Sequence, residues 1–266
     1  MRLDKLLVQN GLFPSREKAQ DAILQKTVMV ANKIVDKPSK EVDEAAAITV
    51  IDLFNKYVSR GGLKLEKAID DFKLDFNGKC VLDIGSSTGG FTDCALQHGA
   101  EFVAAIDVGT DQLHPSLQHH PKVLSLENTD FRKLSLEQVG HRTFDFIVSD
   151  VSFISLTYLF PFFAPFLKDD GRMMLLIKPQ FEAGSSFLNK SGIVTAEKGF
   201  RLAIERVTKE AINQHFSLQG LSMSTLFEKN KNVEFLALFS KADLQSNYKI
   251  DFDILFQQIK KRKNEL

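Results

Sequence analysis

The chain has 266 residues, which is enough for one large domain and one small one. Hydrophobic residues make up 44% and charged residues 26%, as in soluble globular proteins. The formal net charge is zero, so bulk electrostatics do not indicate a nucleic-acid partner. The longest uncharged run, 151–167, contains two prolines and is too short for a membrane span, so we expect no membrane partner.

The compartment is indicated by the N-terminus and the cysteines. The first residues lack the apolar core of a signal peptide. Cys80 and Cys94 do not form a metal-binding pattern, and as free thiols they suit a reducing compartment. We therefore expect a cytoplasmic protein without a bound metal.

Residues 1–57 have the pattern of a small basic α+β module. Apolar spacing over 3–7 predicts one helix, and Ser15 is a suitable N-cap for a second helix that ends near residue 26. Short strands are expected in 28–35, with Asn32 in the turn, and in 47–51. Residues 1–40 contain eight Lys/Arg against four acids, and clustering of basic side chains is the footprint of phosphate contacts. The predicted RNA-binding residues of this module are Arg2, Lys5, Arg16 and Lys18.

A break in the pattern follows at Arg60-Gly61-Gly62, where we expect a flexible linker over 58–62, with Arg60 also available to RNA. Residues 63–266 then form the main domain. Strand and helix patterns alternate along it, which predicts an α/β fold with a doubly wound, mostly parallel sheet of Rossmann type. Strands are expected at 79–84, 102–107, 122–125, 144–149, 172–177, 218–225 and 233–239, and the helices include 91–98, 155–166 and 197–214.

The most informative stretch of the main domain is Val81-Leu-Asp-Ile-Gly-Ser-Ser-Thr-Gly-Gly-Phe-Thr-Asp93. A buried strand leads into a turn of small residues, which lets a ligand approach the backbone and a helix N-terminus. The turn lacks the spacing of a dinucleotide site and better suits a nucleoside cofactor that carries a carboxylate. Asp107 ends the next strand, where ribose hydroxyls are bound, and Asp130 is placed to accept from an adenine amino group. The predicted cofactor-binding residues are Asp83, Gly85, Ser86, Ser87, Thr88, Gly89, Gly90, Asp107, Asp130 and Asp150.

Charged residues follow or precede several other strands. Asp150 and Lys178 come directly after predicted strands, and Glu234 opens the last strand. A lysine beside a buried strand is notable, because desolvation and neighbouring cations lower its pKa toward useful basicity. We expect Lys64, Asp150, Lys178 and Glu234 to converge on one edge of the sheet.

Two sets of motifs carry family resemblances. Arg2-Leu-Asp-Lys-Leu-Leu, Gly11-Leu, Ser15-Arg16 and Val28-x-Val with Val35 and Pro38 resemble the RNA-binding domain named after ribosomal protein S-four. The motifs from Ser59-Arg-Gly-Gly-x-Lys64 through Asp83–Asp93, Asp107-Val-Gly109, Ser149–Ser155 and Ile177–Glu182 to Asn232-x-Glu-Phe-Leu236 are similar to those of the TlyA/hemolysin-A family.

The resemblance to this family implies an FtsJ-like class I methyltransferase that uses S-adenosylmethionine and methylates ribose 2′-hydroxyls of ribosomal RNA in ribosomal subunits. It implies a catalytic tetrad at Lys64, Asp150, Lys178 and Glu234. A ribose hydroxyl is a poor nucleophile until a base removes its proton, which makes Lys178 the expected general base. Asp150 and Glu234 are then expected to orient the lysines and the hydroxyl.

Three other functions are compatible with parts of the sequence. A methyltransferase with a base or small molecule as acceptor would keep the cofactor site, but Asp150-Val-Ser-Phe lacks the Pro-Pro-aromatic strand end of base N-methyltransferases. A membrane-active lysin would depend on 151–167, and a crossover helix packed on the sheet explains the apolar residues of this stretch at less cost. An RNA-binding factor with a decayed site is disfavoured by the complete tetrad.

Overall fold

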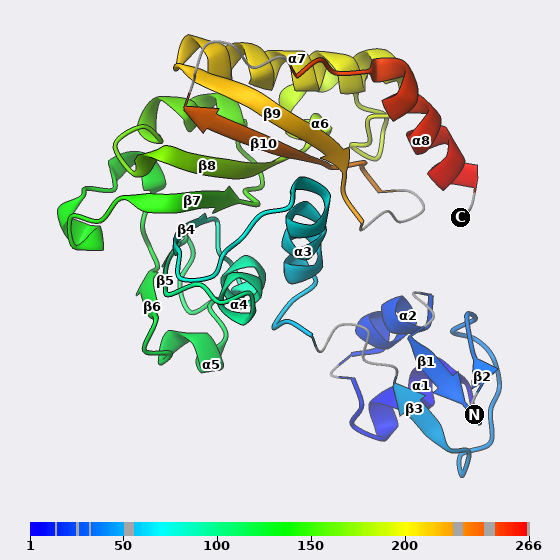
Figure 1. Ribbon diagram of the computed structural model, residues 1–266. Coiled ribbons are helices and arrows are strands. Elements are labelled where there is room, and N and C mark those ends of the chain that lie inside the picture. Colours follow the sequence, from blue (N-terminus) through cyan, green and yellow to red (C-terminus); the bar gives the residue numbers. More distant parts are fainter. Residues whose placement is uncertain are drawn as a thin grey trace. The chain divides into compact units, whose positions relative to one another are not determined.

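The computed structural model describes residues 1–13, 15–24, 27–31, 33–50, 56–225, 231–241 and 248–264. The chain divides into two compact units, Met1–Lys56 and Tyr57–Leu266 (Figure 1). Each unit has a hydrophobic core of its own.

The small unit has the predicted α+β composition. Helices α1 (Leu3–Gln9) and α2 (Arg16–Leu24) accompany an antiparallel sheet of β1 (Val28–Val30), β2 (Lys33–Ile34) and β3 (Ile48–Val50) in the order β2-β1-β3. Both helices bury the apolar residues that their spacing predicts, and the core consists of Leu3, Leu7, Ala19, Ala22, Ile23, Val28 and Val35. Ala31 takes the left-handed conformation in the turn, with φ of 48°. The predicted turn residue Asn32 lies outside the described residues.

The large unit contains a seven-stranded sheet in the order β6-β5-β4-β7-β8-β10-β9, which confirms the predicted doubly wound α/β fold. All neighbours from β6 to β8 are parallel, whereas β10 is antiparallel to both β8 and β9. The chain runs outward in opposite directions from β4 and β7, and ligands bind at such a switch point. The strands are β4 (Cys80–Ile84), β5 (Phe102–Ile106), β6 (Val123–Leu126), β7 (Phe144–Ser149), β8 (Leu167–Ile177), β9 (Phe216–Met223) and β10 (Phe235–Lys241).

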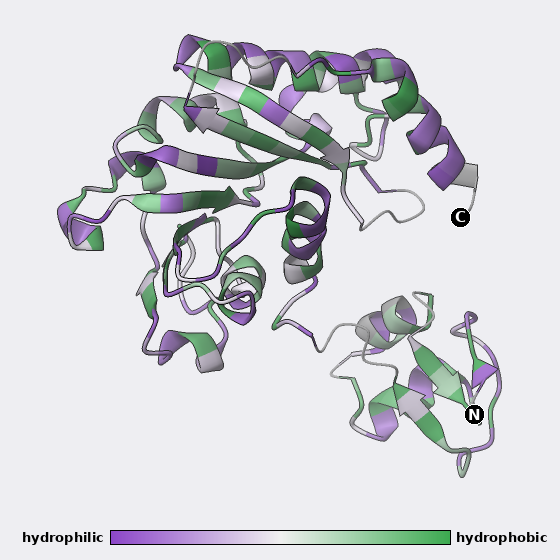
Figure 2. Cartoon of the chain, viewed as in Figure 1, coloured by the Kyte–Doolittle hydropathy of each residue, from purple (hydrophilic) through white to green (hydrophobic). Residues whose placement is uncertain are grey.

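Helices cover both faces of the sheet, as buried parallel strands require. Successive strand residues point to opposite faces, so Val81 packs with α3 (Gly61–Phe72) and α4 (Gly90–Gln97), whereas Leu82 packs in the cluster that contains α7 (Glu197–Asn213). Figure 2 shows green hydrophobic stretches along the strands and purple hydrophilic stretches alternating around α7. The remaining helices are α5 (Pro115–Gln118), α6 (Pro179–Glu182) and α8 (Phe252–Asn264), with short 3-10 turns at Phe131–Lys133, Glu137–Val139 and Ser185–Phe187.

The linker predicted over 58–62 is wrong in its structural character. These residues belong to the large unit, and α3 begins at Gly61 rather than at Leu63. Gly62 packs so closely on the ring of Tyr57 that a Cβ atom there would overlap it. Gly62 is therefore required for close packing, and both glycines lie in the first turn of α3.

The helix predicted over 155–166 is also wrong. The chain forms two 3-10 turns, η3 (Leu156–Tyr158) and η4 (Phe160–Phe162), because Pro161 and Pro165 cannot donate the backbone hydrogen bonds that a continuous helix needs. The apolar side chains of this segment still pack in the core beside the sheet. Strand β8 begins at Leu167, five residues earlier than expected. Within the described residues, no helix combines the length and apolar character needed to cross a membrane.

Candidate active site

The four predicted tetrad residues meet at one edge of the large sheet. Asp150 directly follows β7 and Lys178 directly follows β8, and these parallel strands end on the same side. Glu234 directly precedes β10, which is antiparallel to β8 and pairs Phe235 with Ile177. The start of β10 therefore lies beside the end of β8. Lys64 reaches the same place from the first turns of α3.

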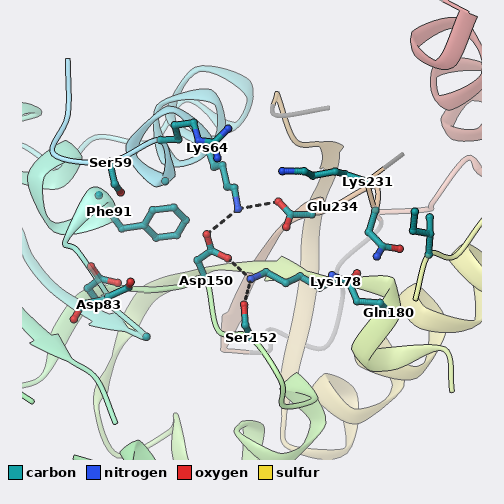
Figure 3. A pocket seen from close by; sticks show the side chains of 18 of the residues that line it. Ser59, Lys64, Asp83, Phe91, Asp150, Ser152, Lys178, Gln180, Lys231 and Glu234 are labelled. Carbon is teal, nitrogen blue, oxygen red and sulfur yellow. Dashed lines mark hydrogen bonds and ion pairs between the residues drawn. The ribbon is translucent and has the colours of Figure 1, made fainter. Parts of the chain in front are cut away.

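Ion pairs join these four side chains into a continuous row. Lys64 Nζ lies 2.9 Å from Asp150 Oδ2 and 2.8 Å from Glu234 Oε2, and Lys178 Nζ lies 2.7 Å from Asp150 Oδ1. Figure 3 shows Lys64 approaching one oxygen of Asp150 from above and Lys178 approaching the other from the right. All four side chains are largely buried. Burial opposes the charged form of Lys64, but the charges of Asp150 and Glu234 outweigh burial and raise the pKa of Lys64 above its usual value.

Ser152 is a site residue that the sequence analysis did not identify. Its Oγ accepts a hydrogen bond of 2.6 Å from Lys178 Nζ, so that lysine is held by Asp150 and Ser152 together (Figure 3). The segment that carries Ser152 is fixed from α6, where buried Glu182 accepts from the hydroxyl of Ser155 and the amide of Leu156. No short-range pattern links these segments, because the contact joins residues 26 or 27 positions apart.

Phe153 follows Ser152 in an unusual conformation. Its side chain is 91% exposed, its φ is 65°, and its ring lies 5.5 Å from that of Phe181. A left-handed backbone is uncommon for a bulky residue and costs roughly 1–3 kcal/mol. The fold thus holds an aromatic ring in solvent one residue away from a partner of Lys178.

A cavity of about 550 Å³ opens beside the tetrad and includes the glycine-rich turn. Asp83 in its wall is 1% exposed, and one of its oxygens accepts from Thr92 Oγ1 at 2.7 Å. Its other oxygen, Oδ1, is buried without a hydrogen-bond partner among the described residues. Burial raises the pKa of Asp83 to about 7, against the opposing hydrogen bonds from Thr92. An unpaired buried acceptor in a cavity wall suits a ligand that brings a donor or a positive charge.

The glycine-rich turn requires its glycines. Gly85 has φ of 79°, and a Cβ atom there would lie 2.9 Å from a methyl group of Val151. Gly90 begins α4, and a Cβ atom there would lie 2.8 Å from the amide nitrogen of Gly62. The turn therefore packs directly against the segment after β7 and against the start of α3, which carry Asp150 and Lys64.

The predicted cofactor residues fall into two groups. Those that line the cavity are Asp83, Gly85, Ser86, Ser87, Gly90 and Asp150. Thr88, Gly89, Asp107 and Asp130 are not among its lining residues. Asp107 supports the turn, because it accepts from the amides of Ser87 and Gly109 at 2.7 Å and 2.8 Å. Asp130 caps the 3-10 turn at Phe131–Lys133 and forms an ion pair with Arg132 at 2.7 Å. Its expected adenine contact stays a prediction and would compete with Arg132.

The opposite wall contains further residues that the analysis did not single out. Asn232 accepts from the amide of Val194 and donates to the carbonyl of Gly192, which holds the 189–193 turn at the cavity. Phe91 and Gln180 also line the cavity (Figure 3), and Gln180 Oε1 is buried without a described hydrogen-bond partner. The predicted RNA-binding residue Arg60 lies in the same lining.

Among the predicted RNA-binding residues of the small unit, Arg2 lies at the start of α1 and Lys5 lies on α1. Arg16 and Lys18 belong to α2. Lys5 is exposed on α1, and Arg2 and Arg16 both form ion pairs with the buried Asp4. The side chain of Lys18 lies outside the described part of the chain. No group of three or more potential metal ligands occurs among the described His, Cys, Asp and Glu residues.

Comparisons with known proteins match both units. The family described as FtsJ-like methyltransferase matches residues 57–241, and the S4 domain matches residues 1–48. The 16S/23S rRNA (cytidine-2′-O)-methyltransferase TlyA of Mycobacterium tuberculosis is 36% identical over 91% of this chain and 91% of its own length. Hemolysin A of Brachyspira hyodysenteriae is 38% identical over 90% of this chain and 99% of its own length.

A solved structure described as "Putative hemolysin from Streptococcus thermophilus" has 38% sequence identity and a TM-score of 0.79. It covers 100% of this chain, and this chain covers 98% of it. The match thus extends over both units and over every segment that contributes to the tetrad. The chain belongs to the FtsJ-like methyltransferase family, and within it to the TlyA/hemolysin-A proteins that carry an N-terminal S4 domain.

Proposed function

We propose that this protein is an S-adenosylmethionine-dependent methyltransferase that modifies ribose 2′-hydroxyls of ribosomal RNA in ribosomal subunits. The observation that carries the proposal is the row of Lys64, Asp150, Lys178 and Glu234 beside a cavity whose wall contains the unpaired carboxylate oxygen of Asp83. The proteins named TlyA among the relatives are described as rRNA (cytidine-2′-O)-methyltransferases, which supports the same acceptor here.

The residues of the cavity fit S-adenosylmethionine. Asp83 would face the positively charged end of the cofactor, because its buried oxygen has no hydrogen-bond partner among the described residues. The backbone of Gly85 to Gly90 would approach the ligand closely, and Asp107, which accepts from the amide of Ser87 in this turn, would bind ribose hydroxyls. When bound, the cofactor supplies a methyl group activated by its sulfonium.

In its neutral form, Lys178 is proposed to accept the proton of the attacking 2′-hydroxyl. It lies at the end of β8, and its Nζ is directed by Asp150 and Ser152. A base in a fixed position raises the nucleophilicity of the hydroxyl oxygen, which would form the new bond to the methyl carbon while the bond from that carbon to the sulfonium sulfur breaks and the sulfur leaves as a neutral thioether. Glu234 pairs with Lys64, and Lys64 pairs with Asp150 and holds it in place.

An RNA acceptor is supported by two further features. The S4 domain carries exposed basic side chains, which suit phosphate contacts. Phe153 presents an exposed ring one residue after Ser152. Enzymes that act on nucleotides within folded RNA stack an unstacked base on such aromatic side chains. A small-molecule acceptor would use neither feature.

The test measures transfer of a labelled methyl group to purified ribosomal subunits that lack the modification. Wild type is expected to label the RNA, and Lys178→Ala is expected to lose at least about 100-fold in rate because the general base is gone. Lys209→Ala, which removes an exposed lysine of α7, serves as the control and keeps the wild-type rate.

Binding of S-adenosylmethionine by Lys178→Ala is measured in parallel and is expected to be nearly unchanged. Near-normal transfer by this variant would refute the role of Lys178. Cofactor binding without label in either subunit would refute the ribosomal acceptor. Leakage of liposomes by the purified protein without RNA would instead favour membrane activity.

A further inference from the structure

The small unit contains a buried ion cluster that the reaction itself does not use. Asp4 is 0% exposed and accepts hydrogen bonds from three side chains. Arg2 donates through Nε at 3.1 Å and through Nη2 at 3.0 Å. Arg16 Nη2 and Gln20 Nε2 contact its Oδ2 at 2.8 Å and 2.6 Å. Asp4 therefore connects the start of α1 with two residues of α2.

Asp4 at the buried centre of the cluster is held by several hydrogen bonds, whereas the two arginines are partly exposed to solvent. The hydrogen bonds from Arg2, and after them those from Arg16 and Gln20, keep the pKa of Asp4 well below its usual range despite burial. The arginine side chains, by contrast, remain 40% and 49% exposed. A guanidinium has five N–H donors, so each arginine keeps donors that Asp4 does not use.

The backbone around Asp4 is fixed as well. The amide of Asp4 donates to the carbonyl of Pro38, and the amide of Leu3 donates to that of Lys40. The backbone of Arg2 pairs with that of Glu41 in an isolated antiparallel β-bridge. The carboxylate thus projects from a backbone that is anchored to the 38–41 segment, and the two arginines are positioned by a rigid acceptor.

One oxygen atom brings the two arginines together. Arg2 Nη2 and Arg16 Nη2 both contact Asp4 Oδ2, at 3.0 Å and 2.8 Å, so the two nitrogens lie within about 5.8 Å of each other. Two oxygens of one phosphate can span such a gap with hydrogen bonds of ordinary length. Two positive charges against one negative charge leave a net attraction for an anion.

We propose that Asp4 is a positioning residue that holds Arg2 and Arg16 as a preformed clamp for a single backbone phosphate of the RNA. This inference depends on the proposed function for the identity of the partner as RNA. The competing explanation is that Asp4 only connects α1 with α2 and that the arginines act as independent surface charges.

The two explanations predict opposite effects for Asp4→Asn. Removal of a negative charge beside two arginines strengthens attraction to RNA if only charge matters. Loss of the clamp weakens binding by about three- to tenfold if position matters. Binding of the full-length protein to protein-free ribosomal RNA is measured by filter retention over a series of salt concentrations. With the clamp lost, the salt dependence of log K also becomes shallower by about 0.7–0.9, the share of one phosphate contact.

Glu17→Gln is the charge-matched control, because Glu17 is an exposed acid on α2 that is next to Arg16 in sequence. It is expected to bind RNA as well as wild type or slightly better. Tighter or unchanged binding by Asp4→Asn, or an equal loss in Glu17→Gln, would overturn the proposal.

A second variant avoids any loss of folding. Arg16→Lys conserves the charge at a half-exposed position but replaces a planar fork by a point charge. The Arg16→Lys variant is expected to bind RNA at least about threefold more weakly than wild type. Adding Asp4→Asn to this variant should cause a smaller further loss of RNA affinity than it causes in wild type, because the clamp is already broken. Equal binding by wild type and Arg16→Lys would refute the clamp.

Methyl transfer separates this inference from the proposed function. Asp4→Asn is expected to raise KM for the RNA and to leave kcat unchanged, since Asp4 belongs to the small unit and the tetrad to the large one. Absence of transfer by wild type would refute the proposed function, while the RNA-binding comparison would still decide on the clamp.

Discussion

Each oxygen of Asp150 holds a different lysine, and this division of one carboxylate organises the active site. Oδ2 pairs with Lys64 and Oδ1 pairs with Lys178. Lys64 also pairs with Glu234, whereas Lys178 has the hydroxyl of Ser152 as its second partner. The two lysines therefore differ in environment: one is bound by two carboxylates, and the other by one carboxylate and a neutral group.

Ser152 is expected to keep Lys178 aimed at the acceptor. Ser152→Ala should lower kcat about tenfold and leave the affinity for S-adenosylmethionine unchanged, because one of the two partners that orient the lysine is lost. Ser191→Ala is a suitable control, since Ser191 lines the same cavity but has no described contact with either lysine. Single-turnover methyl transfer measures both variants, and an undiminished rate for Ser152→Ala would show that Asp150 orients Lys178 alone.

Asp83 is expected to make stability depend on pH. Its pKa is raised to about 7 in the folded protein, above the value of about 4 of an unfolded chain, so the folded state retains a proton that the unfolded state has lost. The contribution of Asp83 to the free energy of unfolding is therefore fully present below about pH 4. It falls by up to about 4 kcal/mol as the pH rises to about 7.

The contribution of Asp83 to stability can be measured as the difference in the free energy of unfolding between wild type and a variant without this carboxyl. Asp83→Asn removes this titration, so the free energy of unfolding of wild type minus that of the variant should fall between pH 4 and pH 7. Urea unfolding at several pH values measures the difference. A difference that is constant or rises over this range would contradict the assigned protonation of Asp83.

At the scale of elements, the crossing of α3 and α4 decides where Lys64 lies. The two helices meet through Gly62 and Gly90, each of which leaves no room for a side chain. A longer side chain at this contact would push α3 away from the sheet edge and move Lys64 away from Asp150. The glycine-rich turn thus contributes to the position of Lys64, a proposed catalytic residue, as well as to the proposed cofactor site.

Gly90→Ala is expected to lower the free energy of unfolding by about 1–3 kcal/mol, because its Cβ would meet the backbone of Gly62 and Gly61 at 2.8 Å and 3.2 Å. Gly61→Ala is the matched control: its Cβ would meet its nearest neighbour at 3.4 Å, an ordinary contact, so stability should not fall. Thermal unfolding compares the two variants. Equal stability of both would contradict the tight contact of α3 with α4.

At the scale of the whole molecule, the proposed roles fall to separate units. Residues 1–56 contain Arg2, Lys5 and Arg16, which are proposed for phosphate contacts, and residues 57–266 contain the tetrad and the glycine-rich turn. RNA affinity and cofactor affinity should therefore change independently when each unit is altered.

Lys5→Glu tests this independence, because Lys5 is exposed on α1. We expect RNA binding to weaken by about threefold or more, with a shallower salt dependence, since one phosphate contact becomes repulsive. The dissociation constant for S-adenosylmethionine should stay at its wild-type value. Lys209→Glu on α7 provides the same change of charge in the large unit. A loss of RNA affinity as large as that of Lys5→Glu would show that net charge alone governs binding.

The sequence by itself determined the fold class and the meeting of the four tetrad residues. Strands that alternate with helices build a parallel sheet, and residues that directly follow parallel strands share one edge, so Asp150 and Lys178 could be placed from their positions alone. The turn of small residues after β4 was equally readable, because only small side chains allow its close contacts.

Only the tertiary structure decided the contacts that depend on exact distances between remote segments. The contacts of Ser152 with Lys178 and of Glu182 with the segment after β7 follow from backbone conformation and side-chain rotamers rather than from periodicity. The glycines at 61 and 62 are the clearest case. Alone they indicate flexibility, but both lie in the first turn of α3, where Gly62 packs against Tyr57, because a missing Cβ permits close contact as readily as it permits motion.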